Sequence, residues 1–554
     1  MEKRTILALV LSFIVLITWT YLFEPSQQDT ARKEPVHQQG TESVPVVPET
    51  SIPVHPGHFE VPDNITAGLT PKADEVEINV DTPLYRAVFS NVGPSIRSFK
   101  LKKYGKTIDP DSPLIELVNL KKDEGDFLLI SFETNATGQN GINVFQTDLN
   151  NIQLGPGSLP KDLVFRSRSI DGLLCEQTFR FYPDQYKIDL KIDVRNQSDR
   201  PVTGIFGTNI KAMPLKKKKS YYSFSGLALL LNNKLKEVKI KKPADPKTLS
   251  GQIGWVAYEN DFFISSIILD QSSDGIFKGQ MLKSGILEGR YIEPPVVLRP
   301  SENIDESYSL YLGPRDLGIL KKVGNNLEKA VNFGWTDVIA KPLLHLLRFF
   351  NQYINNYGLS IILITFLIKT LFWPLTDKSY KSMKDMKKLQ PMMAKLREKY
   401  KNDKVQLNKE MMGLYKTYKI NPMGGCLPMI IQIPVFFALF RILGSAIELR
   451  HAPFFLWIND LSAPDRLFNL PFKIPFMKPP YGIPVLTLLM GASMFLQQKM
   501  TPTPGDPAQA KIMMFLPVIF TFMFINFPSG LVLYWLVNNI LSIGQQYRIN
   551  KRPS

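Results

Sequence analysis

Cysteine and histidine are both scarce in this chain of 554 residues. The two cysteines, Cys175 and Cys426, lie in segments of different character, so no disulfide framework is expected. The five histidines are scattered and form no metal-ligand cluster. None lies between His58 and His345, so the long middle segment lacks the commonest acid–base catalyst, although pairs of carboxylates stay open as an alternative. We expect no cofactor.

Apolar residues are concentrated at the N-terminus and in the last 200 or so positions. Residues 1–23 begin with Lys3 and Arg4 and continue with an apolar run long enough to cross a bilayer. We interpret them as an uncleaved membrane anchor with its basic end in the cytoplasm. A cleaved signal peptide is the alternative, but it needs a shorter apolar core and a small-residue cleavage site, which "TWTYLFEP" lacks.

The middle of the chain divides into a tether and a β domain. Residues 24–57 are rich in Pro, Gln, Ser and Thr and cannot bury enough apolar surface to fold, which predicts a disordered tether. Residues 58–325 show alternation of apolar and polar residues, as in "YKIDLKIDV", "VEINV" and "LYRAVFS", with turn signals such as "NVGPS" and "SSDG". This pattern predicts a large antiparallel β-sandwich domain. It follows the anchor, so it belongs on the side of the membrane opposite the N-terminus.

Basic runs in the β domain invite a nucleic-acid interpretation. "LKKKKS" and "KLKEVKIKK" could contact nucleic acid or anionic lipid. On the non-cytoplasmic side, a solvated surface or a contact with a partner fits better. We therefore expect no specific nucleic-acid recognition.

The C-terminal part has the pattern of a polytopic membrane protein. Residues 333–356, which include "AKPLLHLLRFFNQ", show one apolar stripe and predict an amphipathic helix at the membrane interface. Five further spans are expected in this part of the chain, at residues 357–376, 422–446, 482–500, 512–527 and 530–547. With the anchor there are six, so both termini share one side and the spans after the second occupy residues 422–547.

Loop charge indicates which side that is. Residues 377–421 carry thirteen Lys or Arg against five Asp or Glu, whereas residues 447–481 are nearly balanced. An excess of Lys and Arg marks the cytoplasmic side. The basic tail at residues 548–554 and the "MEKR" start agree with this arrangement, because all three segments fall on one face.

The basic loop has a heptad-like periodicity of its own. Apolar residues recur three or four apart on both sides of "KNDK", which predicts a cytoplasmic coiled-coil hairpin over residues 377–421; a loose basic loop is the alternative. The residues concerned are Met386, Leu389, Met393, Leu396 and Tyr400, then Leu407, Met411, Leu414 and Tyr418.

Lys369 interrupts the second predicted span, "LSIILITFLIKTLFWPLT". A cation at the centre of a spanning helix costs about 2.5 to 3.5 kcal/mol, so it usually faces protein or water. The alternative is that its stem reaches the cytoplasmic interface, about 9 Å away at 1.5 Å per residue.

Other polar residues occur in the predicted spans, but acidic ones do not. Thr365 lies one turn before Lys369, Gln432 lies in the third span, and the last span holds Tyr534, Trp535, Asn538 and Asn539. No Asp or Glu occurs in these five spans, which argues against a proton relay or a carboxylate ion site. We expect a polar, water-containing groove with one fixed positive charge.

Four motifs in this part of the chain carry a family resemblance. They are "NPMGGCLPMIIQIPVFFALF", "ELRHAPFFLWINDLSAPD", "GDPAQAKIMMFLPVIFTFMF" and "FPSGLVLYWLVNNI". They closely resemble the YidC-type membrane protein insertases of Gram-negative bacteria, a branch of the YidC/Oxa/Alb family. The similarity covers the last five spans almost continuously, and the anchor and large β domain fit the Gram-negative branch.

The resemblance implies a non-enzymatic insertase and chaperone of the bacterial inner membrane. It would insert newly made inner-membrane proteins, alone or with the SecYEG and SecDF translocon components, and work with the ribosome and the lipid bilayer. The periplasmic domain would be a β-supersandwich. The groove residues would be Lys369, Thr365, Gln432, Tyr534 or Trp535, to which our reading of the spans adds Asn538. The family's charge is typically arginine; Lys369 keeps the charge but lacks the planar fork.

Two other functions stay open at this point. An ion- or solute-coupled transporter with a periplasmic regulatory domain would need an intramembrane carboxylate or an inverted repeat, and the sequence shows neither. An anchored periplasmic scaffold or sugar-binding module would leave five spans without a purpose.

Overall fold

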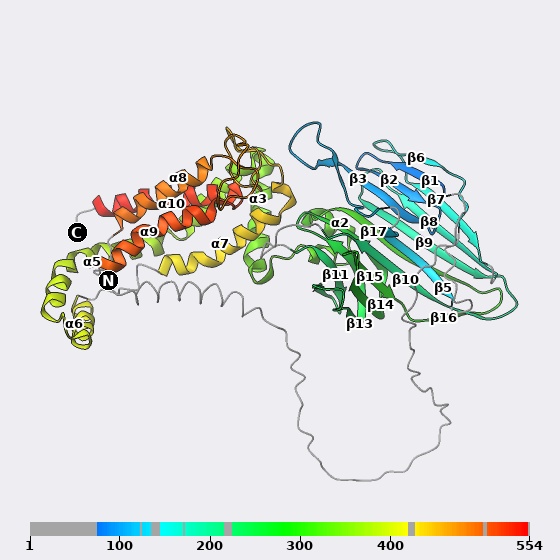
Figure 1. The fold of residues 1–554 in the computed structure, drawn as a ribbon, viewed down its shortest axis with the longest axis horizontal. Coiled ribbons are helices and arrows are strands. Elements are labelled where there is room, and N and C mark those ends of the chain that lie inside the picture. The colour runs from blue at the N-terminus through cyan, green and yellow to red at the C-terminus, as the bar shows by residue number, and fades with distance from the viewer. Residues whose placement is uncertain are drawn as a thin grey trace, which may run out of the picture. The chain divides into compact units, whose positions relative to one another are not determined.

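The computed structural model describes residues 75–121, 124–134, 144–169, 172–214, 224–418, 427–501 and 507–551. The predicted anchor at residues 1–23 and tether at residues 24–57 lie outside these ranges, as do Cys426 and the "LKKKK" run. The described chain begins with β-strands and continues with helices (Figure 1). The prediction of a β-rich domain followed by a helical region is therefore confirmed.

The strands form two sheets. The smaller sheet has the order β4 (Leu114–Glu116), β3 (Ser95–Gly105), β2 (Tyr85–Ser90), β1 (Glu77–Asp81) and β6 (Asn151–Gln153). The path of the larger sheet is β12 (Lys234–Val238), β11 (Gly226–Leu231), β13 (Lys247–Glu259), β14 (Phe263–Met281), β17 (Asn303–Pro314), β9 (Lys187–Asn196), β8 (Leu173–Phe181) and β7 (Lys161–Arg168). Off this path, β10 (Val202–Ala212) pairs with β5 (Leu128–Thr134), β15 (Leu287–Ile292) and β16 (Val296–Leu298).

The apolar faces of the two sheets meet in one core. In β9 every second residue is buried, as the alternation in "YKIDLKIDV" predicts. From the smaller sheet, the ring of Phe89 lies 5.2 Å from Phe179 and 5.5 Å from Phe181 on β8. Aromatic pairs at these separations add to the stabilisation from burial.

Two details of the β prediction are wrong. The domain is not wholly antiparallel, because β1 and β6 pair in parallel. "SSDG" is not a turn, because residues 272–275 lie inside β14. There Ser273 pairs with Ile253 and Asp274 with Gln252 of β13. The hairpin of β13 and β14 supplies hydrogen bonds to the backbone of this segment, so it forms strand although its residues favour a turn.

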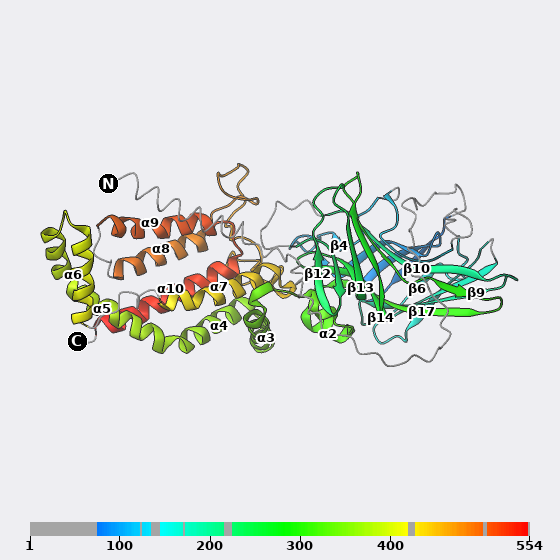
Figure 2. The ribbon, with the colours of Figure 1, turned by 90° about the horizontal axis from the view of Figure 1, so that it is seen from below.

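The helical region starts with short helices and then long ones. The helices up to the hairpin are α2 (Leu317–Val323), η2 (Leu327–Ala330), η3 (Gly334–Thr336), α3 (Asp337–Ile354), α4 (Tyr357–Leu371), α5 (Trp373–Lys399) and α6 (Lys404–Thr417). The later helices are α7 (Leu427–Ser445), η5 (Ile447–Leu449), α8 (Val485–Met500), α9 (Pro507–Phe524) and α10 (Ser529–Lys551). α10 packs against α4, α5, α7 and α8 and is the central helix of this part (Figure 2).

The second predicted span is broken in the structure. α4 ends at Leu371, and α5 begins at Trp373 with Pro374 in its first turn. Proline lacks an N–H group and its ring crowds the carbonyl four residues earlier, which favours a kink in the helix before Pro374. Judged on length and apolarity, the described helices include no single one that would cross a membrane; α4 and α5, bent by 64°, qualify only as a pair.

The basic loop folds as two helices joined by a short turn. α5 and α6 are separated by residues 400–403, and the side chain of Asp403 caps α6 by accepting from the amides of Val405 and Gln406. Three of the apolar residues that carry the heptad-like spacing are buried, namely Met386, Leu389 and Met393. The Tyr415 hydroxyl of α6 lies 3.9 Å from the sulfur of Met393.

Close packing of α8 on α9 depends on Gly491. A Cβ atom at this position would lie 2.2 Å from Oγ1 of Thr521, which is held by a 2.7 Å hydrogen bond to the Pro517 carbonyl. Gly491→Ala is expected to destabilise the fold by about 1 to 3 kcal/mol through overpacking. Thermal unfolding in detergent micelles measures this effect.

The matched control is Gly544→Ala in α10. Nothing lies within 4 Å of a Cβ atom at Gly544, so the same change should stabilise the helix by up to about 1 kcal/mol. Equal shifts for the two variants would contradict the packing argument.

Candidate functional site

The side chain of Lys369 is turned into the helical bundle. It lies in the last turn of α4 and is 7% exposed. Its Nζ donates a 2.6 Å hydrogen bond to Oγ of Ser542 on α10. Ser542 in turn donates a 2.7 Å hydrogen bond to the carbonyl of Asn538, one turn earlier. Among the described residues, no carboxylate lies within 4 Å of the Lys369 amine.

A polar stripe on α10 surrounds this contact. We call it the α10 seam; it consists of Asn538, Asn539, Ser542, Gln545 and Gln546. The last four of these side chains are at most 3% exposed. Buried polar groups of this kind are costly unless they are hydrogen-bonded.

The α10 seam finds its partners on both sides of the helix. Toward α5, Oε1 of Gln545 accepts a 3.0 Å hydrogen bond from the Thr376 hydroxyl, and its Nε2 donates to the Trp373 carbonyl at 3.3 Å. Toward α8, Asn539 donates to Oγ of Ser493 at 3.0 Å. The seam therefore ties the helices that carry Lys369 to those on the other side of α10.

The other predicted groove residues fall into separate groups. Thr365 is buried, and its hydroxyl donates to the Ile361 carbonyl of its own helix at 2.7 Å. Nε2 of Gln432 donates to the Tyr534 hydroxyl at 3.0 Å, which links α7 to α10. Trp535 packs in an aromatic cluster, with ring centroids 5.0 Å from Phe436 and 5.1 Å from Phe524.

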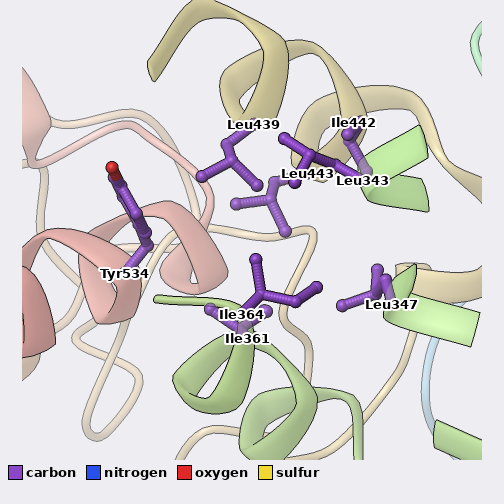
Figure 3. Close-up of a pocket in the computed structure, with 8 residues that line it drawn as sticks. All are labelled: Leu343, Leu347, Ile361, Ile364, Leu439, Ile442, Leu443 and Tyr534. Carbon is purple, nitrogen blue, oxygen red and sulfur yellow. The ribbon is translucent and has the colours of Figure 1, made fainter. Parts of the chain in front are cut away.

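A small cavity lies among α3, α4, α7 and α10 (Figure 3). Its volume is about 10 Å³, close to that of a single water-sized sphere. Apart from Tyr534 its lining is aliphatic: Leu343, Leu347, Ile361, Ile364, Leu439, Ile442 and Leu443. Apolar cavities of this size stay dry, so this cavity is not the wet groove expected beside Lys369.

Sequence reasoning missed the hydrogen-bond partner of Lys369 and a neighbouring polar pair. Ser542, Gln545 and Thr376 were not among the predicted site residues, although all three are buried, Ser542 accepts from Lys369, and Gln545 accepts from Thr376. A signal for them exists: Asn538, Ser542 and Gln545 are four and three apart, so they share one face of a helix. That face is polar within a segment that was judged as an apolar span.

Comparison with known proteins covers the whole chain. A family model described as YidC periplasmic domain matches residues 77–346, and one described as 60Kd inner membrane protein matches residues 349–554. The "Membrane protein insertase YidC" of Syntrophus aciditrophicus is 44% identical over 564 residues and covers 100% of both chains. The protein of the same name from Pelobacter propionicus is 42% identical, covering 100% of this chain and 99% of its own.

The chain belongs to the YidC family. A solved structure of an active YidC insertase is also similar, with 17% identity and a TM-score of 0.36 over 86% of this chain and 93% of that chain. The two sheets lie in the segment that matches the YidC periplasmic domain model, and α4 to α10 lie in the segment that matches the 60Kd inner membrane protein model. The boundary between the two regions falls within α3, at residues 347–348.

The hydrogen bond between Lys369 and Ser542 is expected to be worth about 1.5 to 3 kcal/mol, because one partner is charged. A double-mutant cycle of Lys369→Met and Ser542→Ala, followed by unfolding in detergent micelles, measures this coupling. The control cycle uses Thr376→Val and Gln545→Leu. It tests the hydrogen bond between two neutral side chains, for which a coupling of about 0.5 to 1.5 kcal/mol is expected. Independent effects of the Lys369 and Ser542 changes would contradict the contact.

Proposed function

We propose that this chain is a membrane protein insertase in which Lys369 receives polar or acidic segments of the substrate. It would insert newly made inner-membrane proteins and help them fold, alone or beside SecYEG and SecDF, without catalysing bond chemistry. Its termini would lie in the cytoplasm and its β domain in the periplasm. The observation that carries the proposal is a buried amine whose contact is a neutral hydroxyl.

The charge of Lys369 would lower the barrier to translocating a substrate tail. An ammonium in a site of low dielectric constant attracts an anion much more strongly than it would in water. Ser542 offers it a hydrogen bond but no compensating charge. A carboxylate of the substrate would therefore gain a charge-assisted hydrogen bond with the Lys369 amine, which shortens the path that it travels without solvation.

The apolar helix of the substrate would leave along α7 and α9. These helices expose large apolar side chains: Ile431 and Ile433 on α7, and Phe515, Val518, Ile519 and Phe522 on α9. Such a surface matches lipid tails and an apolar substrate helix equally well. Six membrane spans, with α4 and α7 to α10 as the last five, are part of this proposal.

The hairpin of α5 and α6 would receive the ribosome or the substrate on the cytoplasmic side. Its segment, residues 377–421, has the large excess of Lys and Arg noted above. Charge of this kind steers the encounter with anionic partners such as ribosomal RNA and is weakened by salt.

Lys369→Glu should abolish insertion of substrates with acidic translocated tails, because a like charge then meets the carboxylate. Lys369→Arg should keep most of the activity, and Lys369→Gln should slow acidic-tailed substrates more than neutral-tailed ones. Insertion of paired substrates into vesicles that hold the purified protein measures these effects.

The matched control is Lys283→Glu in the turn between β14 and β15, which makes the same charge change at an exposed position outside the helical region. It should affect acidic-tailed and neutral-tailed substrates alike. Normal insertion of acidic-tailed substrates by Lys369→Glu would refute the charge model.

A further inference from the structure

The loop between η5 and α8 exposes an unusual set of large apolar side chains. We call residues 450–484 the outer loop. Five of its apolar residues are more than half exposed: Phe455, Leu456, Phe468, Phe472 and Phe476. Large apolar side chains that are concentrated and exposed in one loop indicate a site of interaction with a membrane or another protein.

Three of these five residues have a left-handed backbone conformation, with a positive φ angle. Leu456, Phe468 and Phe476 have φ angles of 58°, 60° and 63°, and they are the three most exposed of the five, at 86%, 70% and 84%. Large residues seldom adopt this conformation, which costs about 1 to 3 kcal/mol each. Such strain persists only where the surroundings hold it, so the loop presents these three residues in a fixed way.

Hydrogen bonds from partly buried side chains hold the backbone at and after Phe476. Asn526, between α9 and α10, donates to the Phe476 carbonyl at 2.7 Å and accepts from the amide of Lys478 at 2.7 Å. Arg466 donates to the carbonyls of Pro480 and Ile525 at 2.9 Å and 2.8 Å. The outer loop is therefore fastened to the turn that connects the last two helices.

A second set of contacts fastens the loop to the start of α8. The indole Nε1 of Trp457 donates to Oδ1 of Asp465 at 2.6 Å, and Oδ2 of Asp465 accepts from the amide of Leu486 at 2.5 Å. Leu467 and Ile483 exchange backbone hydrogen bonds of 2.8 Å and 2.9 Å. The loop that carries the exposed apolar side chains is thus hydrogen-bonded to the start of α8 and to the turn between α9 and α10.

The second half of the outer loop is basic. Residues 466–484 contain Arg466, Lys473 and Lys478 and no acidic residue, whereas the whole outer loop, which also holds Arg450, Asp460 and Asp465, has a net charge of +2. Phenylalanine combined with lysine suits the boundary between headgroups and acyl chains of an anionic bilayer, where rings enter the apolar layer and amines meet phosphates.

The helices next to the loop are shorter than the hydrocarbon core of a bilayer, so the loop would lie close to the membrane interface. α8 has 16 residues and α9 has 18, or about 24 Å and 27 Å, against a hydrocarbon core of about 30 Å. At the end that meets the outer loop, α8 exposes Leu488 and Leu489, and α9 exposes Phe522 and Met523. The hydrogen bond from Asn526 holds Phe476 close to the end of α9, so its exposed ring lies near the exposed apolar side chains of that helix end.

We propose that the outer loop is a membrane anchor, which inserts Leu456, Phe468 and Phe476 into the headgroup–acyl boundary of an anionic bilayer while Lys473 and Lys478 bind the phosphates. The inference rests on the proposed embedding of α7 to α10 in the membrane. It adds a third attachment, beside the spans and the amphipathic α3, on the face opposite the basic hairpin. Mismatch between the short helices and the bilayer is thereby reduced.

Depth-dependent quenching of a fluorophore tests this anchor. The full chain with Cys175→Ser and Cys426→Ser receives one cysteine, as Phe476→Cys, Leu489→Cys on α8, or Leu159→Cys in the β domain, where Leu159 is 83% exposed. Each variant is labelled with an environment-sensitive dye and reconstituted alone into phosphatidylethanolamine–phosphatidylglycerol vesicles. Nitroxide groups are placed on the lipid chains either near the headgroup or near the chain end.

The expected result is a blue-shifted label at position 476 that shallow nitroxides quench more than deep ones. The label at position 489 should also be quenched by lipid, whereas the one at position 159 should not. Adding Lys473→Glu and Lys478→Glu should reduce quenching at position 476 in anionic vesicles and leave it unchanged in phosphatidylcholine vesicles.

Other outcomes separate the inference from the proposed function. Quenching at position 489 without quenching at position 476 would overturn the anchor and leave the embedded helices intact. Loss of quenching at both positions would overturn the embedding and the anchor together. A blue shift at position 476 that appears only when purified SecYEG is added would identify a protein partner and overturn the lipid assignment.

Discussion

The helical region is organised around one buried ammonium, that of Lys369. A lysine in an apolar helix costs about 2.5 to 3.5 kcal/mol unless it finds solvation or a counter-charge. Here the hydroxyl of Ser542 supplies part of the solvation, and the described residues supply no counter-charge. The amine is therefore held in place but not neutralised, and this is the state in which it attracts an anion from another molecule most strongly.

The interior of the bundle changes from polar to apolar along α10. Toward its C-terminus lie Ser542, Gln545 and Gln546, which hydrogen-bond to Lys369 on α4, Thr376 on α5 and Thr501 just after α8. Toward its N-terminus lie Tyr534, beside the dry cavity, and Trp535, within the aromatic cluster. If the C-terminus is cytoplasmic, the polar half faces the side from which substrates arrive, and the apolar half faces the opposite leaflet.

Sequence patterns predicted the features that depend on local chemistry and missed those that depend on partners. The alternation in β9 and the spacing of Met386, Leu389 and Met393 match buried faces, because periodicity alone decides which side is apolar. "SSDG" forms strand because it pairs with β13, and local sequence rules do not include pairing with a distant strand. Pro374 did carry a local signal for the break after α4, but the span length outweighed it. Ser542 was missed because its role exists only once α10 lies against α4.

The central claim is that substrate segments contact the face of α10 that lies against Lys369 of α4. A photoreactive amino acid at Asn538, on the α10 seam, and at Ile540, which is 54% exposed on another face of the same helix, tests this directly. With ribosome-stalled nascent chains of an acidic-tailed substrate, the account predicts strong crosslinks at position 538 that Lys369→Glu removes, and weaker, unchanged ones at position 540. Equal crosslinking at both positions, or crosslinks at position 538 that persist in Lys369→Glu, would contradict it.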